Sequence, residues 1–584
     1  MGPDSPLPHN EIFESTEAYV SSLLAFVGHD PLLRVLCGGV HILDFFTSEP
    51  DLYSQILSQE WRDFFAQHQI MDVLDLLMRE DLQDFVNLEP DSWRDGPVPP
   101  QSVIAYIANV RKHLLNRQPS STQCARNRAT KPTQKLARNV AVGMNIKKVH
   151  EVGLFASYIS NLTSEISNST DHYISHLVDF GSGQNYLGRA LASEPYNRSI
   201  VAIESKESNA ERAREYDITA KLAQKQQVLR NKKAFRAGAD VPHDMVAPTE
   251  LPTHPPELVS AANVAASSEA VDYESIERPT GGMGSIQYIS HRITDGRLTD
   301  VLPRILTINP QLMTISLHSC GNLIHHGLRS LILNPSVKAV AMVGCCYNLL
   351  TERLGPATYK HPELRPTRSS HPRVEKEGEA RDPDGFPMSE RLCLHEEGNG
   401  IRLNITARMM AVQAPQNWGE KDSEGFFTRH FYRALLQKVF LDYDVVGPPR
   451  REREGASPSG HSSGTPIVIG SLRKSCYVDF VTYVRGALAK LEEQPDIGER
   501  IKHKMSHLSD KDIAAYEQAY RHRKKDLSVV WSLMAFSAGV IEATIVADRF
   551  LWLREQAEVK EAWVEGVFDY GISPRNLVVV GIKG

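Results

Sequence analysis

Short apolar runs alternate with helix-length segments through the middle of this 584-residue chain. Each run is rich in Val, Ile and Leu, as is typical of strands that are buried on both faces of a sheet. Strands that alternate with helices build a parallel, doubly wound sheet. The pattern therefore predicts an α/β fold. The runs expected to form strands are 176–180, 200–203, 285–290, 312–318 and 337–344.

Helical periodicity dominates on both sides of this central part. Residues 11–116 read as a series of helices, and further helices are expected downstream at 403–412, 426–439, 477–491, 510–525 and 527–555. Two last apolar runs, 562–569 and 576–582, flank a turn that contains Pro574, which indicates a terminal pair of strands. Such a pair is typical of a Rossmann-like sheet extended at its edge by an antiparallel strand.

The chain divides by composition into a helical N-terminal region at 1–116, a basic linker at 117–146 and a main domain at 147–584. From Arg111 to His150 there are ten Lys and Arg residues and no Asp or Glu. This segment is either a solvated linker or a contact surface for RNA or an acidic partner, although no interleaved aromatic residues are present to stack on bases. Long irregular inserts rich in Pro, Gly or charge are expected at 225–280, 355–399 and 447–465.

Composition excludes several classes of protein. A net charge of -6 gives no overall attraction to nucleic acid or acidic membranes, and seven scattered cysteines without a CxxC pair indicate no disulfide framework. The N-terminus lacks a secretory pattern, and the most apolar stretch, 529–541, is too short to span a bilayer. We therefore expect an intracellular protein, cytoplasmic or nuclear, with no membrane or metal partner.

The sequence LVDFGSGQNYL at 177–187 joins the first predicted strand to a helix. Its first glycine, Gly181, permits a tight turn, and Gly183 lets the backbone approach a ligand at the helix N-terminus. A dinucleotide fingerprint requires a third glycine where this chain has Tyr186, which disfavours NAD or FAD. The next glycine is Gly188.

Two carboxylates indicate a different ligand. Asp179 precedes the loop, where it can hydrogen-bond the loop amides and meet a cationic amino-acid tail through water. Glu204 ends the second strand, where a carboxylate accepts hydrogen bonds from ribose hydroxyls. Together they fit S-adenosylmethionine, with an ordinary glycine turn as the alternative. The expected cofactor-binding residues are Asp179, Gly181, Ser182, Gly183, Tyr186, Leu187, Glu204 and His318.

Further reactive side chains follow the fourth and fifth strands, where this fold places substrates. His318 is a candidate general base, and Cys320, Cys345, Cys346 and Tyr347 are candidates for the catalytic, substrate-facing surface. Each of these residues has buried packing as its alternative role. His318 and the three cysteines are also a conceivable ligand set, but adjacent cysteines chelate one tetrahedral ion with difficulty, so no metal is expected.

Five segments in this order resemble the methyltransferase-like protein twenty-five family, which includes a "ribosomal RNA adenine dimethylase domain-containing" protein. They are MNIKKVHEV at 144–152, DFGSGQNYL, LHSCGNL, GCCYNLLTE with the later GFPMS, and FDYGISPRNLVVVGIK near the end. The resemblance implies a seven-stranded, S-adenosylmethionine-dependent methyltransferase fold behind a helical N-terminal part. It also implies that Asp179, Gly181, Gly183 and Glu204 bind the cofactor and that 318–321 lie near its methyl group.

The chain departs from the family at Gln184, where a lysine is expected. It also lacks the Asn/Asp-Pro-Pro-aromatic turn typical of adenine amino-group methylation, having His318-Ser319-Cys320-Gly321 instead. The predicted function is therefore methyl transfer to an unidentified acceptor, protein or RNA. The alternatives are a non-catalytic scaffold with the same fold and a different nucleotide-dependent enzyme, such as an NAD oxidoreductase.

Overall fold

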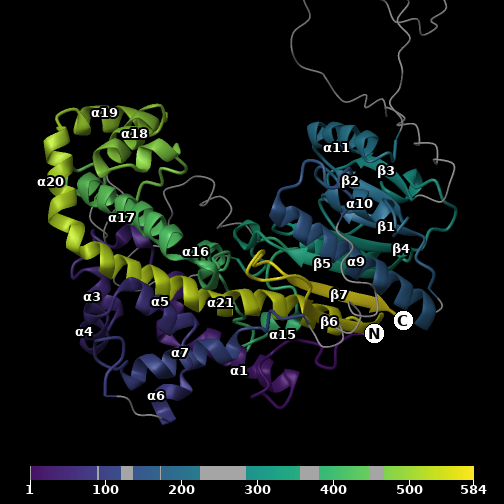
Figure 1. Ribbon diagram of the computed structural model, residues 1–584, viewed down its shortest axis with the longest axis horizontal. Coiled ribbons are helices and arrows are strands. Elements are labelled where there is room, and N and C mark those ends of the chain that lie inside the picture. The colour runs from purple at the N-terminus through teal and green to yellow at the C-terminus, as the bar shows by residue number, and fades with distance from the viewer. Residues whose placement is uncertain are drawn as a thin grey trace, which may run out of the picture.

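The computed structural model describes residues 2–87, 91–119, 136–170, 172–223, 284–355, 381–447 and 466–584. A lobe of helices lies beside an α/β lobe, and one long helix, α21 (Lys524–Arg554), runs from the first into the second (Figure 1). Of the predicted inserts, 225–280 lies outside the described residues, as do 448–465 and 356–380.

Seven strands form one sheet in the order β3-β2-β1-β4-β5-β7-β6. The first five pair in parallel, and β7 is inserted antiparallel between β5 and β6. The predicted seven-stranded α/β sheet with a terminal strand pair is therefore confirmed. The strands are β1 His176–Phe180, β2 Ser199–Glu204, β3 Ser285–Ser290, β4 Leu312–Ser319, β5 Val337–Gly344, β6 Val559–Gly566 and β7 Leu577–Lys583.

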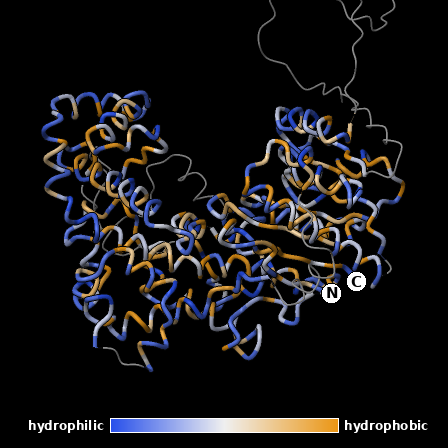
Figure 2. The backbone as a smooth tube through the Cα atoms, in the orientation of Figure 1, coloured by the Kyte–Doolittle hydropathy of each residue, from blue (hydrophilic) through white to orange (hydrophobic). Residues whose placement is uncertain are grey.

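Both faces of the sheet are covered because side chains alternate along each strand. Val178 and Phe180 belong to the core shared with α13 (Leu323–Leu333) and α21. Leu177 and the other strand residues whose side chains point to the opposite face of the sheet belong to a second core, which includes α9 (Ile146–Ser169) and α10 (Tyr186–Ala192). Apolar residues accordingly concentrate along the strands and along α21 (Figure 2).

The helical lobe is assembled from two parts of the chain, since helices that precede β1 and helices that lie between β5 and β6 both pack on α21. Several of its helices begin at side-chain caps; Ser15, for example, accepts from the amide of Ala18. The N-terminal helices are α1 Thr16–His29, α2 Pro31–Arg34, α3 Leu52–Ile56, α4 Gln59–Gln67, α5 Ile70–Met78, α6 Gln83–Asn87 and α7 Gln101–His113. The later ones are α15 Glu390–Cys393, α16 Ile405–Met410, α17 Glu420–Asp442, α18 Phe480–Glu492, α19 Gly498–Met505 and α20 Asp510–Tyr520.

The segment Asp510–Arg554 contains α20 and α21 and is long and apolar enough to cross a membrane. Its most apolar window is, however, 94% buried within the protein. Helices α1, α5, α7, α16 and α17 surround α21 and supply that burial. This is the arrangement of a core helix.

Among the basic residues predicted as linker or contact surface, Arg111 and Arg117 make hydrogen bonds or ion pairs within the protein. The Arg111 guanidinium donates hydrogen bonds to the carbonyls of Leu76, Leu77 and Glu80. Arg117 forms an ion pair with Glu542 of α21, with Nη2 and Oε2 2.5 Å apart. Arg111 therefore joins α7 to the end of α5 within the N-terminal region, and Arg117 connects that region to α21. Residues 120–135 lie outside the described part of the chain.

Candidate functional site

The glycine loop after β1 is held against the end of β2. Gly181 and Gly183 both have positive φ, 67° and 57°, which glycine adopts without strain. The Ser182 amide donates to the Ile203 carbonyl at 3.0 Å, and the Gly183 amide donates to Oε2 of Glu204 at 2.8 Å. A Cβ at Gly183 would meet nothing within 4 Å, so this part of the loop faces open space.

One role that we expected of Asp179 is taken by the second predicted cofactor carboxylate, Glu204. We expected Asp179 to hold the loop amides, but the bond to the Gly183 amide is made by Glu204, because Glu204 reaches the loop from the neighbouring strand. Asp179 is buried, and no cationic side chain pairs with it within the described ranges. Burial and the nearby Glu204 raise the pKa of Asp179 to about 8. A ligand cation beside Asp179 would favour its ionised form.

Behind the loop lies a buried polar network that sequence reasoning missed. Arg189 of α10 pairs with Asp217 of α11 (Glu207–Thr219) at 3.1 Å. Tyr288 donates to Asp217 at 2.5 Å and accepts from the side-chain amide of Asn185 at 2.9 Å. Asn185 itself has a positive φ of 50° at the start of α10. The network thus fixes the loop from behind, and its only sequence signal was an arginine among the apolar residues of α10.

Tyr186 and Leu187, the two predicted cofactor residues after the glycines, both contact other parts of the protein. The Tyr186 hydroxyl lies 2.8 Å from the Gly143 carbonyl and 2.5 Å from the Gln184 side-chain carbonyl, either of which can accept its proton. Leu187 is buried in the core shared with α9. The close contact between helix α10 and strand β2 occurs at Gly188, where a Cβ would lie 3.0 Å from Ile200. The tight packing expected of a third glycine therefore occurs two residues later.

His318, near the end of β4, is paired with a carboxylate from α9. Its Nε2 lies 3.3 Å from Oε2 of Glu151, and Ser573 donates to Oε1 of Glu151 at 2.6 Å. Burial acts to raise the pKa of Glu151, but hydrogen bonds from His318 and Ser573 hold it below its ordinary value. Sequence reasoning missed Glu151, whose signal is a carboxylate among the apolar residues that α9 buries.

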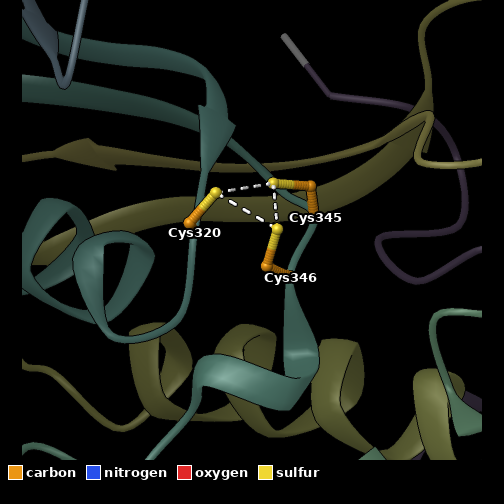
Figure 3. Close-up of side chains that lie close together, drawn as sticks. All are labelled: Cys320, Cys345 and Cys346. Atoms are coloured by element: carbon orange, nitrogen blue, oxygen red, sulfur yellow. Dashed lines mark hydrogen bonds between the residues drawn. The ribbon is translucent and has the colours of Figure 1, made fainter. Parts of the chain in front are cut away.

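Three of the candidate cysteines come together where β4 and β5 end (Figure 3). The Sγ atoms of Cys320 and Cys345 are 3.3 Å apart, those of Cys320 and Cys346 3.2 Å, and those of Cys345 and Cys346 3.5 Å. Hydrogen bonds from Cys320 and then Cys345 lower the pKa of Cys346 to about 3. Cys320 is exposed, so the cluster is accessible from solvent.

The fourth residue of the conceivable ligand set, His318, and the last catalytic candidate, Tyr347, lie outside the group of three thiols. His318 is not part of the compact thiol group and contacts Glu151 instead. Tyr347 is buried, and its hydroxyl donates to Glu542 at 2.7 Å. Its ring also lies 5.5 Å from the guanidinium carbons of both Arg549 and Arg575. The hydroxyl of Tyr347 is thus already used in holding α21 to the turn.

The strand order brings these groups to one edge of the sheet. Because β1 lies between β2 and β4, the glycine loop has Glu204 on one side and the His318–Cys320 turn on the other. The two sides are in contact, since a Cβ on Gly181 would lie 2.8 Å from Leu323 at the start of α13. A nucleotide-type loop and a set of reactive side chains therefore share the carboxyl edge, where this class of sheet binds ligands.

This fold and the placement of these groups are typical of methyltransferases, and residues 147–353 match a family described as "Methyltransferase domain". The chain is also 24% identical over 519 residues to the human "Probable methyltransferase-like protein 25", covering 75% of each chain. It is 23% identical to the mouse protein of the same name over 510 residues, again 75% of each. The family resemblance predicted from the motifs is thereby confirmed. No solved structure matches the chain.

Proposed function

We propose that the protein transfers a methyl group from S-adenosylmethionine to a macromolecular acceptor, protein or RNA. The observation that carries the proposal is the junction at the carboxyl edge: Glu204 and the glycine loop on one side, His318 and Glu151 on the other. The first set suits a nucleoside with an amino-acid tail, and the second suits a group that gives up a proton.

The residues of the loop fit the cofactor. Oγ of Ser182 is buried without a hydrogen-bond partner among the described residues, and the space at Gly183 is open. An open cleft lies beside Glu204, lined by the residues where β2 and β3 give way to loops: Ser205, Lys206, Ser290, His291 and Arg292. Glu204 and Ser182 would hold the nucleoside part, and Asp179 would meet the cationic tail.

When bound, S-adenosylmethionine supplies an electrophilic methyl group on a sulfonium. The contribution of the protein is positioning, with the acceptor aligned opposite the leaving sulfur. His318 lies at the end of β4 and would take the acceptor proton through its ring nitrogen. Glu151 holds Nε2 of His318 and stabilises the imidazolium that forms.

Accessibility of the acceptor side supports a large substrate. The side chain of His318 is 45% exposed, and Cys320 is exposed as well. An acceptor group therefore reaches the edge from solvent without entering a closed cavity, as a side chain of a folded protein or a base of an RNA must. We further propose an intracellular site of action, in the cytoplasm or nucleus and away from membranes.

Transfer of labelled methyl from S-adenosylmethionine into the protein and RNA fractions of a cell extract tests the proposal. We expect label in one macromolecular fraction with the wild-type protein and not with His318→Ala. Absence of cofactor binding by calorimetry would overturn the proposal. Binding with no label in any fraction would instead support the non-catalytic scaffold.

A further inference from the structure

The three thiols at the ends of β4 and β5 form a compact group that the proposed methyl transfer does not use. All three sulfurs lie within 4.8 Å of one another, and their side chains point toward a common centre (Figure 3). They come from two turns, which backbone hydrogen bonds join: the Gly321 amide donates to the Cys346 carbonyl, and the Cys345 amide to the Ser319 carbonyl. The group is therefore fixed by the sheet itself.

We propose that Cys320, Cys345 and Cys346 form a binding site for one zinc ion, with the fourth coordination position open toward solvent. Thiolates are preferred zinc ligands, and three protein ligands with one open position are typical of reactive zinc sites. This inference goes beyond the proposed methyl transfer and does not depend on it.

The adjacency of Cys345 and Cys346 is no obstacle in this structure. Along a continuing strand, successive side chains point to opposite faces of the sheet. Here β5 ends at Gly344, and Cys346 leaves the extended conformation with φ of -99° and ψ of 75° before the short helix Tyr347–Leu349. The turn brings both sulfurs to the same side, 3.5 Å apart.

The sulfur separations suit a single ion. Tetrahedral zinc with bonds of about 2.3 Å places its sulfur ligands roughly 3.8 Å apart. The observed separations of 3.2, 3.3 and 3.5 Å are a few tenths of an ångström shorter. Small side-chain rotations would widen the triangle to the metal-bound spacing without moving either turn.

The surroundings compensate the charge of such a site. Three thiolates around a divalent cation carry a net charge of -1. Arg549 is buried and interacts electrostatically with Cys345, and Arg575 interacts with Cys346. Gly344 allows this approach, because a Cβ there would lie 2.6 Å from Nη1 of Arg549. The positive groups therefore favour an anionic metal–thiolate centre.

Metal analysis of the full-length protein purified with zinc and a thiol reductant tests the site. We expect one equivalent of zinc in the wild-type protein, and at least tenfold weaker retention against a chelator in Cys320→Ser and Cys346→Ser. Cys476→Ser is the matched control, because Cys476 is also partly exposed but lies far from the cluster in sequence, and it should retain the metal.

Cobalt titration of the wild-type protein gives a second readout that needs no folded variant. Three thiolate ligands should give intense sulfur-to-cobalt charge-transfer absorption that zinc abolishes. Less than about a tenth of an equivalent of zinc, with no charge-transfer band on addition of cobalt, would overturn the site. A disulfide that forms among the three cysteines despite saturating zinc would overturn it equally.

Discussion

The two halves of the carboxyl edge of the sheet are built in different ways. The half after β1 and β2 is formed by one short stretch of chain, and its loop is held by Glu204 from the next strand. The half after β4 and β5 takes its groups from distant segments: Glu151 from α9, His318 from β4, Cys320 from the turn that follows it, and Glu542 from α21. The first half is thus a local motif, whereas the second exists only in the folded protein.

This difference gives the helical lobe a role in the site. Glu542 of α21 accepts a hydrogen bond from Tyr347 and pairs with Arg117 and Arg575, with N···O distances of 2.5 and 2.7 Å. One buried carboxylate therefore ties the N-terminal region, the C-terminal hairpin and the turn after β5 together. The helices support the acceptor half, and the cofactor half does not depend on them to the same extent.

The largest expected effect is the loss of stability when the carboxylate of Glu542 is removed. Burial acts to raise the pKa of Glu542, but Arg117 and Arg575 hold it below its ordinary value, so the group is ionised in the folded protein. Glu542→Ala leaves two buried arginines without their partner, which should cost about 3–5 kcal/mol of unfolding free energy. Urea denaturation followed by circular dichroism measures this loss.

A matched variant tests whether the loss of unfolding free energy is specific to the buried carboxylate of Glu542. Glu499→Ala removes a carboxylate that is 92% exposed and pairs with Lys502, so it should change the unfolding free energy by less than about 1 kcal/mol. Equal losses in the two variants would contradict the role given to Glu542 in joining the lobes.

On the cofactor half, Glu204→Ala should have its main effect on affinity. The substitution removes a charged acceptor from the Gly183 amide and from the proposed ribose site, a loss of about 1.5–3 kcal/mol, or roughly tenfold or more in the dissociation constant. Calorimetry with S-adenosylmethionine measures it. Glu207→Ala, which changes a carboxylate at the start of α11, is the control and should bind as the wild type does.

Asp179 provides a dependence on pH that distinguishes the halves further. Its folded-state pKa is raised to about 8, above the value of about 3.9 expected in the unfolded chain. The folded protein therefore holds more protons in this window, and the stability contributed by the protonated group is full below about pH 4 and is lost as the pH rises through about 8. Asp179→Asn should flatten this part of the stability profile and be the more stable protein at pH 8.

Binding of the cofactor should show the opposite trend at the same residue. Because a cationic ligand favours the ionised carboxylate, the affinity of the wild-type protein should rise between pH 6 and 8, and that of Asp179→Asn should not. Thermal unfolding and calorimetry over this range measure both properties on the same samples. Parallel pH profiles for the two proteins would show that Asp179 does not face the ligand.

The contrast between the two halves also explains which features of the protein could be predicted from its sequence. Strand runs such as 176–180 and the LVDFGSGQNYL loop are local patterns, so the five parallel strands were predicted to within one residue, whereas β6 begins and ends three residues before its predicted run 562–569. The Glu151–His318 pair, the Arg189–Asp217 pair and the Glu542 junction join residues far apart in the chain. No local periodicity marks such contacts, because their partners meet only after the sheet and α21 have packed. The cysteines were recognised singly, but their convergence depends on the turn after β5.

The smallest expected effect concerns Tyr186, which the loop pattern placed at the cofactor. In the structure its hydroxyl faces the Gly143 carbonyl, and its ring lies against Tyr216 and Lys148, with ring centroids 6.0 Å apart and Nζ 4.7 Å from the ring. Tyr186→Phe keeps the ring and removes one hydrogen bond, so it should cost about 1 kcal/mol of stability. Its affinity for S-adenosylmethionine should stay within about threefold of the wild type, since less than about 1 kcal/mol of binding energy is at stake. A tenfold loss of affinity at unchanged stability would show that Tyr186 contacts the cofactor. The cofactor site would then include Tyr186 as well as the glycine loop and Glu204.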